Sequence, residues 1–249
     1  MKYKYGTKWL EIIDSTNSQA HRELDNLDNL SVLAAGFQTA GRGQRGNKWL
    51  SKAWENLTFS MVIKPDTYHI AASKQFIISE IATLAVSSYL DSREISCKIK
   101  WPNDIYVRDK KICGMLIENS LSGPEVASSI IGIGLNVNQT EFDPQLMNPT
   151  SMKKLTGQTY DVKTELPYII ERICQYIDVL SGEEGETEID RLYQSRLYRL
   201  DELHEYRNYL EDSTFKGYIR KVDNDGRVVV ETIEGKELRF AFKELGYII

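Results

Sequence analysis

The sequence predicts an α/β (α+β) protein, in which helices flank a mixed, largely antiparallel sheet and a small SH3-like β-barrel follows at the C-terminus. Three observations predict this class. Strand and helix patterns alternate up to about residue 205, and several neighbouring strands are separated by short polar turns. The remaining residues contain only short alternating strands and turns. We therefore expect a main domain at residues 1–205 and a second domain at residues 206–249.

The expected strands are runs of apolar and β-branched residues between polar or glycine-rich segments. In the main domain they cover residues 8–13, 32–38, 56–64, 96–100, 103–107, 111–118 and 128–138. A tight polar turn at 108–110 joins two of these strands, which predicts an antiparallel hairpin. In the second domain they cover residues 214–222, 227–233 and 236–242.

The expected helices are segments whose apolar residues recur at helical spacing. They cover residues 16–27, 68–90, 162–180 and 186–199. Thr16 and Gln19 have the spacing of a capping box, so Thr16 is the predicted N-cap of the first helix. No strand separates the last two helices, which are expected to close the sheet.

The composition is that of an ordinary globular protein, with 41% hydrophobic and 27% charged residues. A formal net charge of -5 creates no overall attraction for a nucleic-acid backbone, so we expect no DNA binding. The chain shows neither a signal peptide nor a run of about 18 apolar residues, which predicts a cytoplasmic protein away from membranes. Cys97, Cys113 and Cys174 lack the spacing of a disulfide framework or zinc site and are expected to be buried and reduced.

A glycine-rich loop at residues 41–49 is the first candidate site. Its sequence, Gly-Arg-Gly-Gln-Arg-Gly-Asn-Lys-Trp, holds three glycines and three cations. Backbone N–H groups and positive charge can therefore approach an anion such as phosphate or carboxylate. Asn47 stands where a P-loop has lysine, so the segment is not a P-loop. A plain basic surface loop is the alternative.

A bend at residues 100–104, Lys-Trp-Pro-Asn-Asp, is the second candidate. Pro102 favours extended backbone, which projects Asn103 and Asp104 from a strand edge. An amide such as Asn103 suits a nucleobase edge, and a carboxylate such as Asp104 suits Mg²⁺ or the proton of an amine. An Asx turn without a ligand is the alternative.

The third candidate consists of a lysine and glycines within strands. Lys111 opens a strand in which Gly114 clears space, and Gly132 and Gly134 interrupt another apolar strand. Such glycines allow a flat ligand to lie against the backbone. Val137 replaces the third glycine of a dinucleotide fingerprint, which excludes that type of site. The alternatives are a solvated turn lysine and glycines that serve core packing.

The order of these segments along the chain is more specific than any one of them. The set comprises Asp14-Ser15-Thr16-Asn17, Gln38 with Gly41-Arg42-Gly43, Lys100 to Asp104, Lys111 with Gly114, and Gly132-x-Gly134-x-Asn136. From about Lys8 onward the chain resembles the biotin–protein ligases. The resemblance implies that biotin and MgATP give biotinoyl-AMP, from which biotin passes to a lysine of a biotin carboxyl carrier domain. It also implies a monofunctional form, because the first catalytic strand begins too early for a DNA-binding domain to precede it.

The resemblance assigns catalytic roles to Lys111, Arg42 and Asp104. Lys111 contacts the biotin carboxylate and the α-phosphate, while Arg42 helps to hold these anions and orders the loop over the intermediate, tasks that suit cationic side chains. Asp104 receives the acceptor lysine, whose free pKa is about 10.4, and assists its deprotonation. Asp104 is also the candidate Mg²⁺ ligand.

The resemblance further implies two sets of binding residues. For biotin these are Ser15, Thr16, Asn17, Gln38, Gly41, Arg42, Gly43, Gln44, Lys111, Gly114 and Gly132. For ATP these are Arg42, Arg45, Trp49, Lys100, Asn103, Lys111 and Asn136. Gln44 and Asn47 depart from the family pattern, because many members carry arginines there, and fewer phosphate contacts are expected.

Two other functions compete with this interpretation. A lipoate or octanoate ligase or acyltransferase of the same fold is disfavoured by the combination of the 41–46 loop with the 100–104 bend. A non-catalytic ligand-binding adaptor is disfavoured by the presence of Arg42, Asp104 and Lys111. The sequence leaves a homodimer open.

Overall fold

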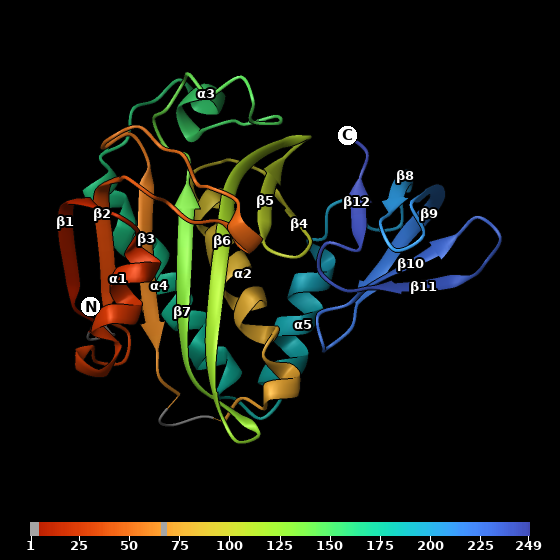
Figure 1. Ribbon diagram of the computed structural model, residues 1–249, viewed down its shortest axis with the longest axis horizontal. Helices are drawn as coiled ribbons and strands as arrows, with labels where there is room; N and C mark the ends of the chain where they lie inside the picture. Colours follow the sequence, from red (N-terminus) through yellow and green to blue (C-terminus); the bar gives the residue numbers. More distant parts are fainter. Residues whose placement is uncertain (1–4, 66–68) are drawn as a thin grey trace.

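A seven-stranded sheet with the order β1-β2-β3-β7-β6-β5-β4 forms the centre of the computed structural model, which describes residues 5–65 and 69–249 (Figure 1). Its strands are β1 (Thr7–Ile13), β2 (Val32–Gln38), β3 (Leu57–Ile63), β4 (Lys98–Lys100), β5 (Asp104–Val107), β6 (Lys110–Ser122) and β7 (Glu125–Leu135). β1 and β2 are parallel, and the other neighbours are antiparallel. The predicted mixed, largely antiparallel sheet is confirmed.

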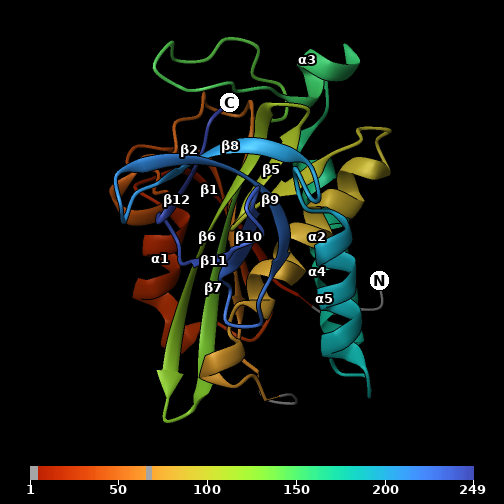
Figure 2. The ribbon, with the colours of Figure 1, turned by 90° about the vertical axis from the view of Figure 1, so that its right-hand side faces the viewer.

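Helices cover both faces of this sheet (Figure 2). The helices are α1 (Thr16–Glu23), α2 (Ile77–Asp91), α3 (Met152–Thr156), α4 (Val162–Leu180) and α5 (Gly185–Ser195). α1 packs on one face, while α2, α4 and α5 lie on the other and enclose most of the hydrophobic core. Within the described ranges, no helix has both the length and the apolar character needed to cross a membrane. Cys97, Cys113 and Cys174 are buried and free, as expected.

A second, antiparallel sheet follows at the C-terminus, with the order β11-β10-β9-β8-β12. Its strands are β8 (Leu203–Asn208), β9 (Ser213–Val222), β10 (Val228–Thr232), β11 (Glu237–Phe240) and β12 (Leu245–Tyr247). This arrangement fits the predicted fold class. The predicted domain boundary after residue 205 falls inside β8, and the division into two domains stays a prediction.

The two sheets share side-chain contacts. The indole Nε1 of Trp101, in the β4–β5 bend, donates to the carbonyl of Gly226 at 2.9 Å. The Trp101 ring also meets Phe242 edge-on, with 5.5 Å between ring centroids. Buried valines of the second sheet, Val228 and Val230, belong to the same hydrophobic core as the large sheet. The β4–β5 bend is therefore held by the C-terminal sheet.

The predicted N-cap of α1 is wrong by one residue. The cap is Ser15, whose hydroxyl accepts from the backbone N–H of Ser18 at 3.5 Å. Thr16 instead donates its N–H and its hydroxyl to Gln38 Oε1, at 2.7 and 3.2 Å. Gln19 bonds within the helix rather than back to the cap. A long-range contact with β2 therefore replaces the local capping box.

The predicted helix at 68–90 begins too early, and its first residue lies outside the described residues. α2 starts at Ile77. The segment before it pairs with the start of β7 instead: Ala72 N–H donates to Pro124 O at 2.7 Å, and Val126 N–H donates to Ile70 O at 2.9 Å. Sheet-type hydrogen bonds thus override the helical spacing of the apolar residues.

The predicted helix at 186–199 is too long at its end for a similar reason. α5 stops at Ser195. Ile99 N–H donates to Arg196 O at 2.8 Å, and Tyr198 N–H donates to Ile99 O at 2.8 Å. The residues after α5 therefore pair with β4, which ties the end of this helix to the strand that precedes the 100–104 bend.

Candidate active site

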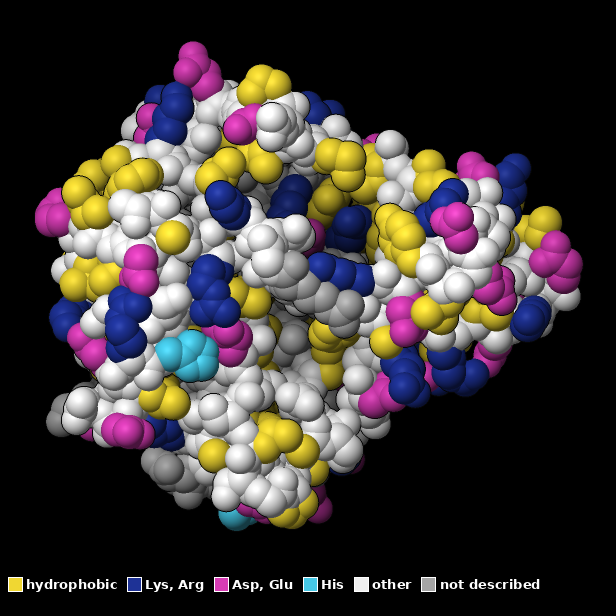
Figure 3. All heavy atoms as spheres, viewed as in Figure 1, with side chains coloured by type: hydrophobic (Ala, Val, Ile, Leu, Met, Phe, Trp, Pro, Cys, Tyr) yellow, Lys and Arg dark blue, Asp and Glu magenta, His cyan; other side chains and the backbone are white. Residues whose placement is uncertain are grey.

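A cavity of about 640 Å³ opens between the large sheet and the C-terminal sheet (Figure 3). Its walls come from the start of α1, the loop 41–49, the β4–β5 bend, the middle of β6 and β7, and the chain around β12. Lys and Arg side chains gather around the hollow in Figure 3. The cavity therefore offers a positively charged surrounding to a ligand.

One end of the cavity is a buried polar network below α1. Ser60 Oγ lies 2.7 Å from Thr16 Oγ1 and 2.6 Å from Asn17 Oδ1. Asn17 Nδ2 donates to Leu116 O at 3.1 Å, which fixes the amide. Gln38 uses its Oε1 for Thr16, and its NH2 group makes no hydrogen bond within the described part of the chain. This end presents a fixed acceptor on Asn17 and a donor on Gln38.

The floor of the cavity is made of glycines on β6 and β7. Gly114 and Gly134 face each other across the two strands. A Cβ atom at Gly134 would come within 2.2 Å of the Trp49 ring, and one at Gly132 within 2.1 Å of Asn17 Oδ1. Only glycine fits at these two positions without displacing its neighbours. The missing side chains therefore let the Trp49 ring and the Asn17 amide lie against the β7 backbone.

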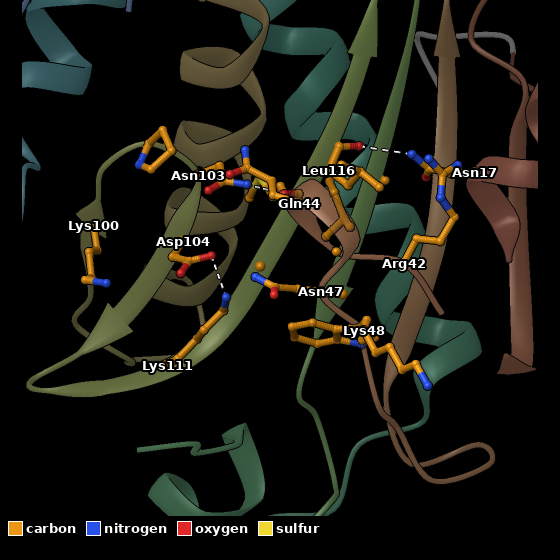
Figure 4. Close-up of a pocket in the computed structure, with 18 of the residues that line it drawn as sticks. Asn17, Arg42, Gln44, Asn47, Lys48, Lys100, Asn103, Asp104, Lys111 and Leu116 are labelled. Carbon is orange, nitrogen blue, oxygen red and sulfur yellow. Dashed lines mark hydrogen bonds and ion pairs between the residues drawn. The ribbon is translucent and has the colours of Figure 1, made fainter. Parts of the chain in front are cut away.

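One wall of the cavity carries a lysine and a carboxylate in contact. Lys111 Nζ lies 2.6 Å from Asp104 Oδ1, and the two side chains are 31% and 19% exposed. Figure 4 shows them pointing toward each other from β6 and β5. In the antiparallel register Asp104 lies opposite Gly114, and the Lys111 side chain extends over Gly114 to reach the Asp104 carboxylate. The wall thus presents a cation and a proton acceptor side by side.

Lys100 adds a second cation to this wall. Its Nζ lies 4.9 Å from the ring centre of Tyr106 and 4.6 Å from that of Tyr247. Burial lowers the pKa of Lys100; Asp104 opposes this shift, and Lys111 adds to it. Because Tyr247 belongs to β12, the C-terminal sheet forms part of the wall.

Arg42 lies at the other end of the cavity, near Asn17 (Figure 4). Its two terminal nitrogens donate to Glu118, NH2 to Oε1 at 2.6 Å and NH1 to Oε2 at 3.2 Å. Burial would raise the pKa of Glu118, but hydrogen bonds from Asn17 and Arg42 hold it below its ordinary value. Arg42 is therefore paired with a charged carboxylate and is separated from the Lys111–Asp104 wall.

Comparison with known proteins decides the family. Residues 9–136 match the model of the biotin/lipoate A/B protein ligase family. Over 245 residues the chain is 32% identical to the bifunctional ligase/repressor BirA of Bacillus spizizenii. The alignment covers 95% of this chain and 73% of that protein. The chain belongs to the biotin/lipoate A/B protein ligase family.

Two further relatives match this chain along most of its length. The biotin–[acetyl-CoA-carboxylase] ligase of Paracoccus denitrificans is 28% identical, with 90% of this chain and 94% of that protein covered. The solved structure of the Aquifex aeolicus biotin protein ligase in complex with biotin and ATP has a TM-score of 0.80 and 28% identity, covering 98% and 99% of the two chains. The predicted resemblance is confirmed, and the chain is a ligase enzyme.

The ligase fold brings most of the predicted site residues into one cavity. Those lining it are Ser15, Thr16, Asn17, Gln38, Arg42, Gly43, Gln44, Trp49, Lys100, Asn103, Asp104, Lys111, Gly114 and Gly132. Their individual roles in binding and catalysis stay predictions.

Two predicted residues, Gly41 and Asn136, lie outside the cavity lining. Gly41, the first residue of the loop, is buried, and a Cβ atom there would come within 2.4 Å of the Trp49 carbonyl. Asn136 is also buried, and its amide donates to Thr150 O at 2.9 Å rather than lining the cavity. The side chain of Arg45 lies outside the described part of the structure. Their assignments to biotin and ATP are untested.

Sequence reasoning missed three residues that shape the site. Ser60 supports Thr16 and Asn17, and its signal is a polar residue inside the otherwise apolar strand β3. Glu118 holds Arg42, and its signal is a charge that follows an apolar run on β6. Tyr247 reaches the cavity from the C-terminal sheet, and no local pattern indicates this contact.

Proposed function

We propose that this ligase activates biotin with ATP to give biotinoyl-AMP and then transfers the biotinoyl group to a lysine of a biotin carboxyl carrier domain. The observation that carries the proposal is a single cavity that joins an amide-binding end, a glycine floor and a cationic wall. The names of the relatives from Paracoccus denitrificans and Aquifex aeolicus support biotin as substrate and, for the latter, ATP.

The buried polar end suits the ureido ring of biotin. A ureido group has N–H donors and one carbonyl acceptor, which complement Asn17 Oδ1 and the NH2 group of Gln38. Gly132 and Gly134 leave room for the Asn17 amide and the Trp49 ring to pack on β7, where both line the cavity beside this end. The valerate chain would then extend toward the wall that carries Lys111.

In the first step the biotin carboxylate attacks the α-phosphorus of ATP. A carboxylate oxygen–phosphorus bond forms, the bond to the β-phosphate oxygen breaks, and pyrophosphate leaves with that electron pair. Two anions must approach each other, so a cation between them lowers the barrier. Lys111 is placed for this role on the cavity wall. In the proposal its ammonium group contacts both the carboxylate and the α-phosphate, and Arg42 also holds these anions.

In the second step the acceptor lysine attacks the acyl carbon and AMP leaves with the electron pair of the acyl–oxygen bond. A lysine with a pKa of about 10.4 must lose a proton to react. Asp104 is the only carboxylate among the described residues that line the cavity, and its Oδ1 is bound to an ammonium group, Lys111 Nζ. We propose that Asp104 accepts the proton of the incoming amine in the same way.

Mg²⁺ fits this site as a companion of ATP. In the described ranges no group of three or more His, Cys, Asp or Glu residues is arranged to hold a metal ion. Asp104 is the carboxylate that the described residues contribute to the cavity lining. Mg²⁺ commonly binds through one or two carboxylates together with substrate phosphates, where it neutralises their charge. Asp104 is the residue that would hold it.

Pyrophosphate exchange into ATP, measured in turn with biotin, lipoate and octanoate, tests the proposal. We expect exchange with biotin and Mg²⁺ and little with the other two acids, because the polar end complements a ureido ring. Equal exchange with lipoate would refute the biotin assignment and favour the lipoate branch of the family. Transfer is tested by mass spectrometry on a purified carrier domain and on its acceptor Lys→Arg variant, which should remain unmodified.

A further inference from the structure

Glu118 connects three parts of the site that are far apart in the sequence. Its carboxylate accepts from both terminal nitrogens of Arg42 and, at 2.8 Å, from Asn17 Nδ2. His21 Nε2 lies 3.3 Å from the same carboxylate. Glu118 on β6 thus joins the loop 41–49 to the start of α1.

The geometry of the Arg42–Glu118 pair is that of a two-point fork. Arg42 is 42% exposed and Glu118 is 23% exposed, so solvent screens the pair only in part. Arg42 lines the cavity, whereas Glu118 lies behind it and outside its lining. The guanidinium group therefore stands between an internal carboxylate and the space in which the anions of the reaction meet.

The position of Arg42 is coupled to the rest of the loop. Gly43 N–H donates to Asn47 O at 2.7 Å, and Trp49 N–H donates to Gly41 O at 2.9 Å. These bonds close the loop into a small hairpin, so its two arms move together. The Trp49 ring at its far end lies against Gly134 on the cavity floor. The Glu118 carboxylate, through Arg42, thus holds the loop that roofs the cavity.

We propose that Glu118 is a positioning residue that anchors the loop 41–49 through Arg42 and competes with the anions of the reaction for its guanidinium group. The competition part rests on the proposed function, in which the biotin carboxylate is one of those anions. An anion that draws Arg42 from Glu118 must replace a two-point ion pair. Glu118 therefore lowers the affinity for charged ligands relative to neutral ones.

The variant that tests this is Glu118→Gln. Glutamine keeps the size of the side chain and an oxygen that accepts from Asn17, but it removes the charge that holds Arg42. The matched control is Glu188→Gln, which breaks the two-point pair of Glu188 with Arg191 on α5, at 2.8 and 2.8 Å, away from the cavity. Arg42→Lys is a second variant, which keeps the positive charge but loses the fork.

The first measurement needs no ligand: the rate of tryptic cleavage within the loop 41–49 of the folded protein. We expect cleavage about three- to tenfold faster in Glu118→Gln, the range that the loss of one partly exposed ion pair allows. Glu188→Gln should match the wild type. If Glu118→Gln is folded but is cleaved at the wild-type rate, the anchoring role is refuted. Should that variant fail to fold, a wild-type rate in Arg42→Lys refutes it equally.

The second measurement compares the dissociation constants of biotin and of its neutral methyl ester by titration calorimetry. The dissociation constant of the ester divided by that of biotin should rise about three- to tenfold in Glu118→Gln, because only the charged ligand competes for Arg42. A change in loop order or in Asn17 affects both ligands and cancels in the ratio. An unchanged ratio overturns the competition. If the wild type binds no biotin, the proposed function fails, whereas the cleavage rates still decide the anchoring role.

Discussion

Replacement of Glu80 by glutamine should stabilise the ligase at neutral pH. Glu80 lies on α2, is 4% exposed and faces a small cavity that it shares with Asp190 of α5. Burial raises the pKa of Glu80 from 4.5 to about 8, and the charge of Asp190 adds to the effect. In the folded protein at pH 7 this carboxyl group is therefore mostly protonated, whereas in the unfolded chain it is ionised.

The sign and size of the effect follow from proton linkage. Above the unfolded pKa the folded state binds more protons than the unfolded state, so the free energy of unfolding falls as pH rises. The free energy of unfolding falls between about pH 4.5 and about pH 8, which correspond to the pKa of Glu80 in the unfolded and in the folded state. At 1.36 kcal/mol per pH unit, the loss between the lower value and pH 7 is on the order of 3 kcal/mol. Glutamine has no such titration and keeps a similar shape.

Urea unfolding of the wild type and Glu80→Gln at several values from about pH 5 to 8 measures this effect. The two proteins should have similar free energies of unfolding at the acid end. The variant should gain roughly 1 kcal/mol over the wild type for each pH unit above that. The Glu188→Gln protein, which alters an exposed helix pair, should show no such trend. A difference between wild type and Glu80→Gln that stays constant with pH would refute the reasoning.

Three further predictions concern the site. Lys111→Ala should remain folded but lose adenylation by about two to three orders of magnitude, because a charge-assisted contact to the reacting anions is removed. Biotin-dependent pyrophosphate exchange measures this loss, and near-normal exchange would contradict the prediction. Gly132→Ala should weaken biotin binding at least tenfold, since its Cβ atom would lie 2.1 Å from Asn17 Oδ1, and calorimetry with an unchanged affinity would disprove the steric argument. Gln44→Arg should retain biotinoyl-AMP about ten- to a hundredfold longer in a dilution trap, because hydrogen bonds to charged groups contribute roughly 1.5–3 kcal/mol. Equal release rates in the wild type and the variant would show that another cation already supplies the phosphate contact.

The strands of the large sheet were predicted well because their apolar runs are local signals, whereas β8 and β12 of the C-terminal sheet were missed. β2 (Val32–Gln38) matches its predicted range, and β3 lies within its own. The helix ends were predicted less well, because distant partners decide them. The hydroxyl of Thr16 in α1 bonds to Gln38 at the end of β2, and the residues before α2 pair with β7. Such contacts leave no trace in the spacing of nearby residues.

The site was predicted mainly from motifs, and these gave the cavity lining but not its internal pairings. The family pattern located Arg42 and Lys111 on the cavity, yet it suggested that both hold the same anions. In the structure each cation has its own carboxylate, Glu118 for Arg42 and Asp104 for Lys111. These pairings depend on the register of β6 against β5 and on the path of the loop. Neither follows from sequence spacing alone.

The bend at residues 100–104 has a consequence for the engineering of chimaeric ligases. Trp101 bonds to Gly226, and Lys100 lies between Tyr106 and Tyr247, so the bend is held by side chains from both sheets. An exchange of residues 203–249 for the corresponding segment of a relative would therefore also change the surroundings of Lys100 and Asp104. A graft intended to redirect carrier recognition would need the matching aromatic residues at both ends of this contact to keep its adenylation rate.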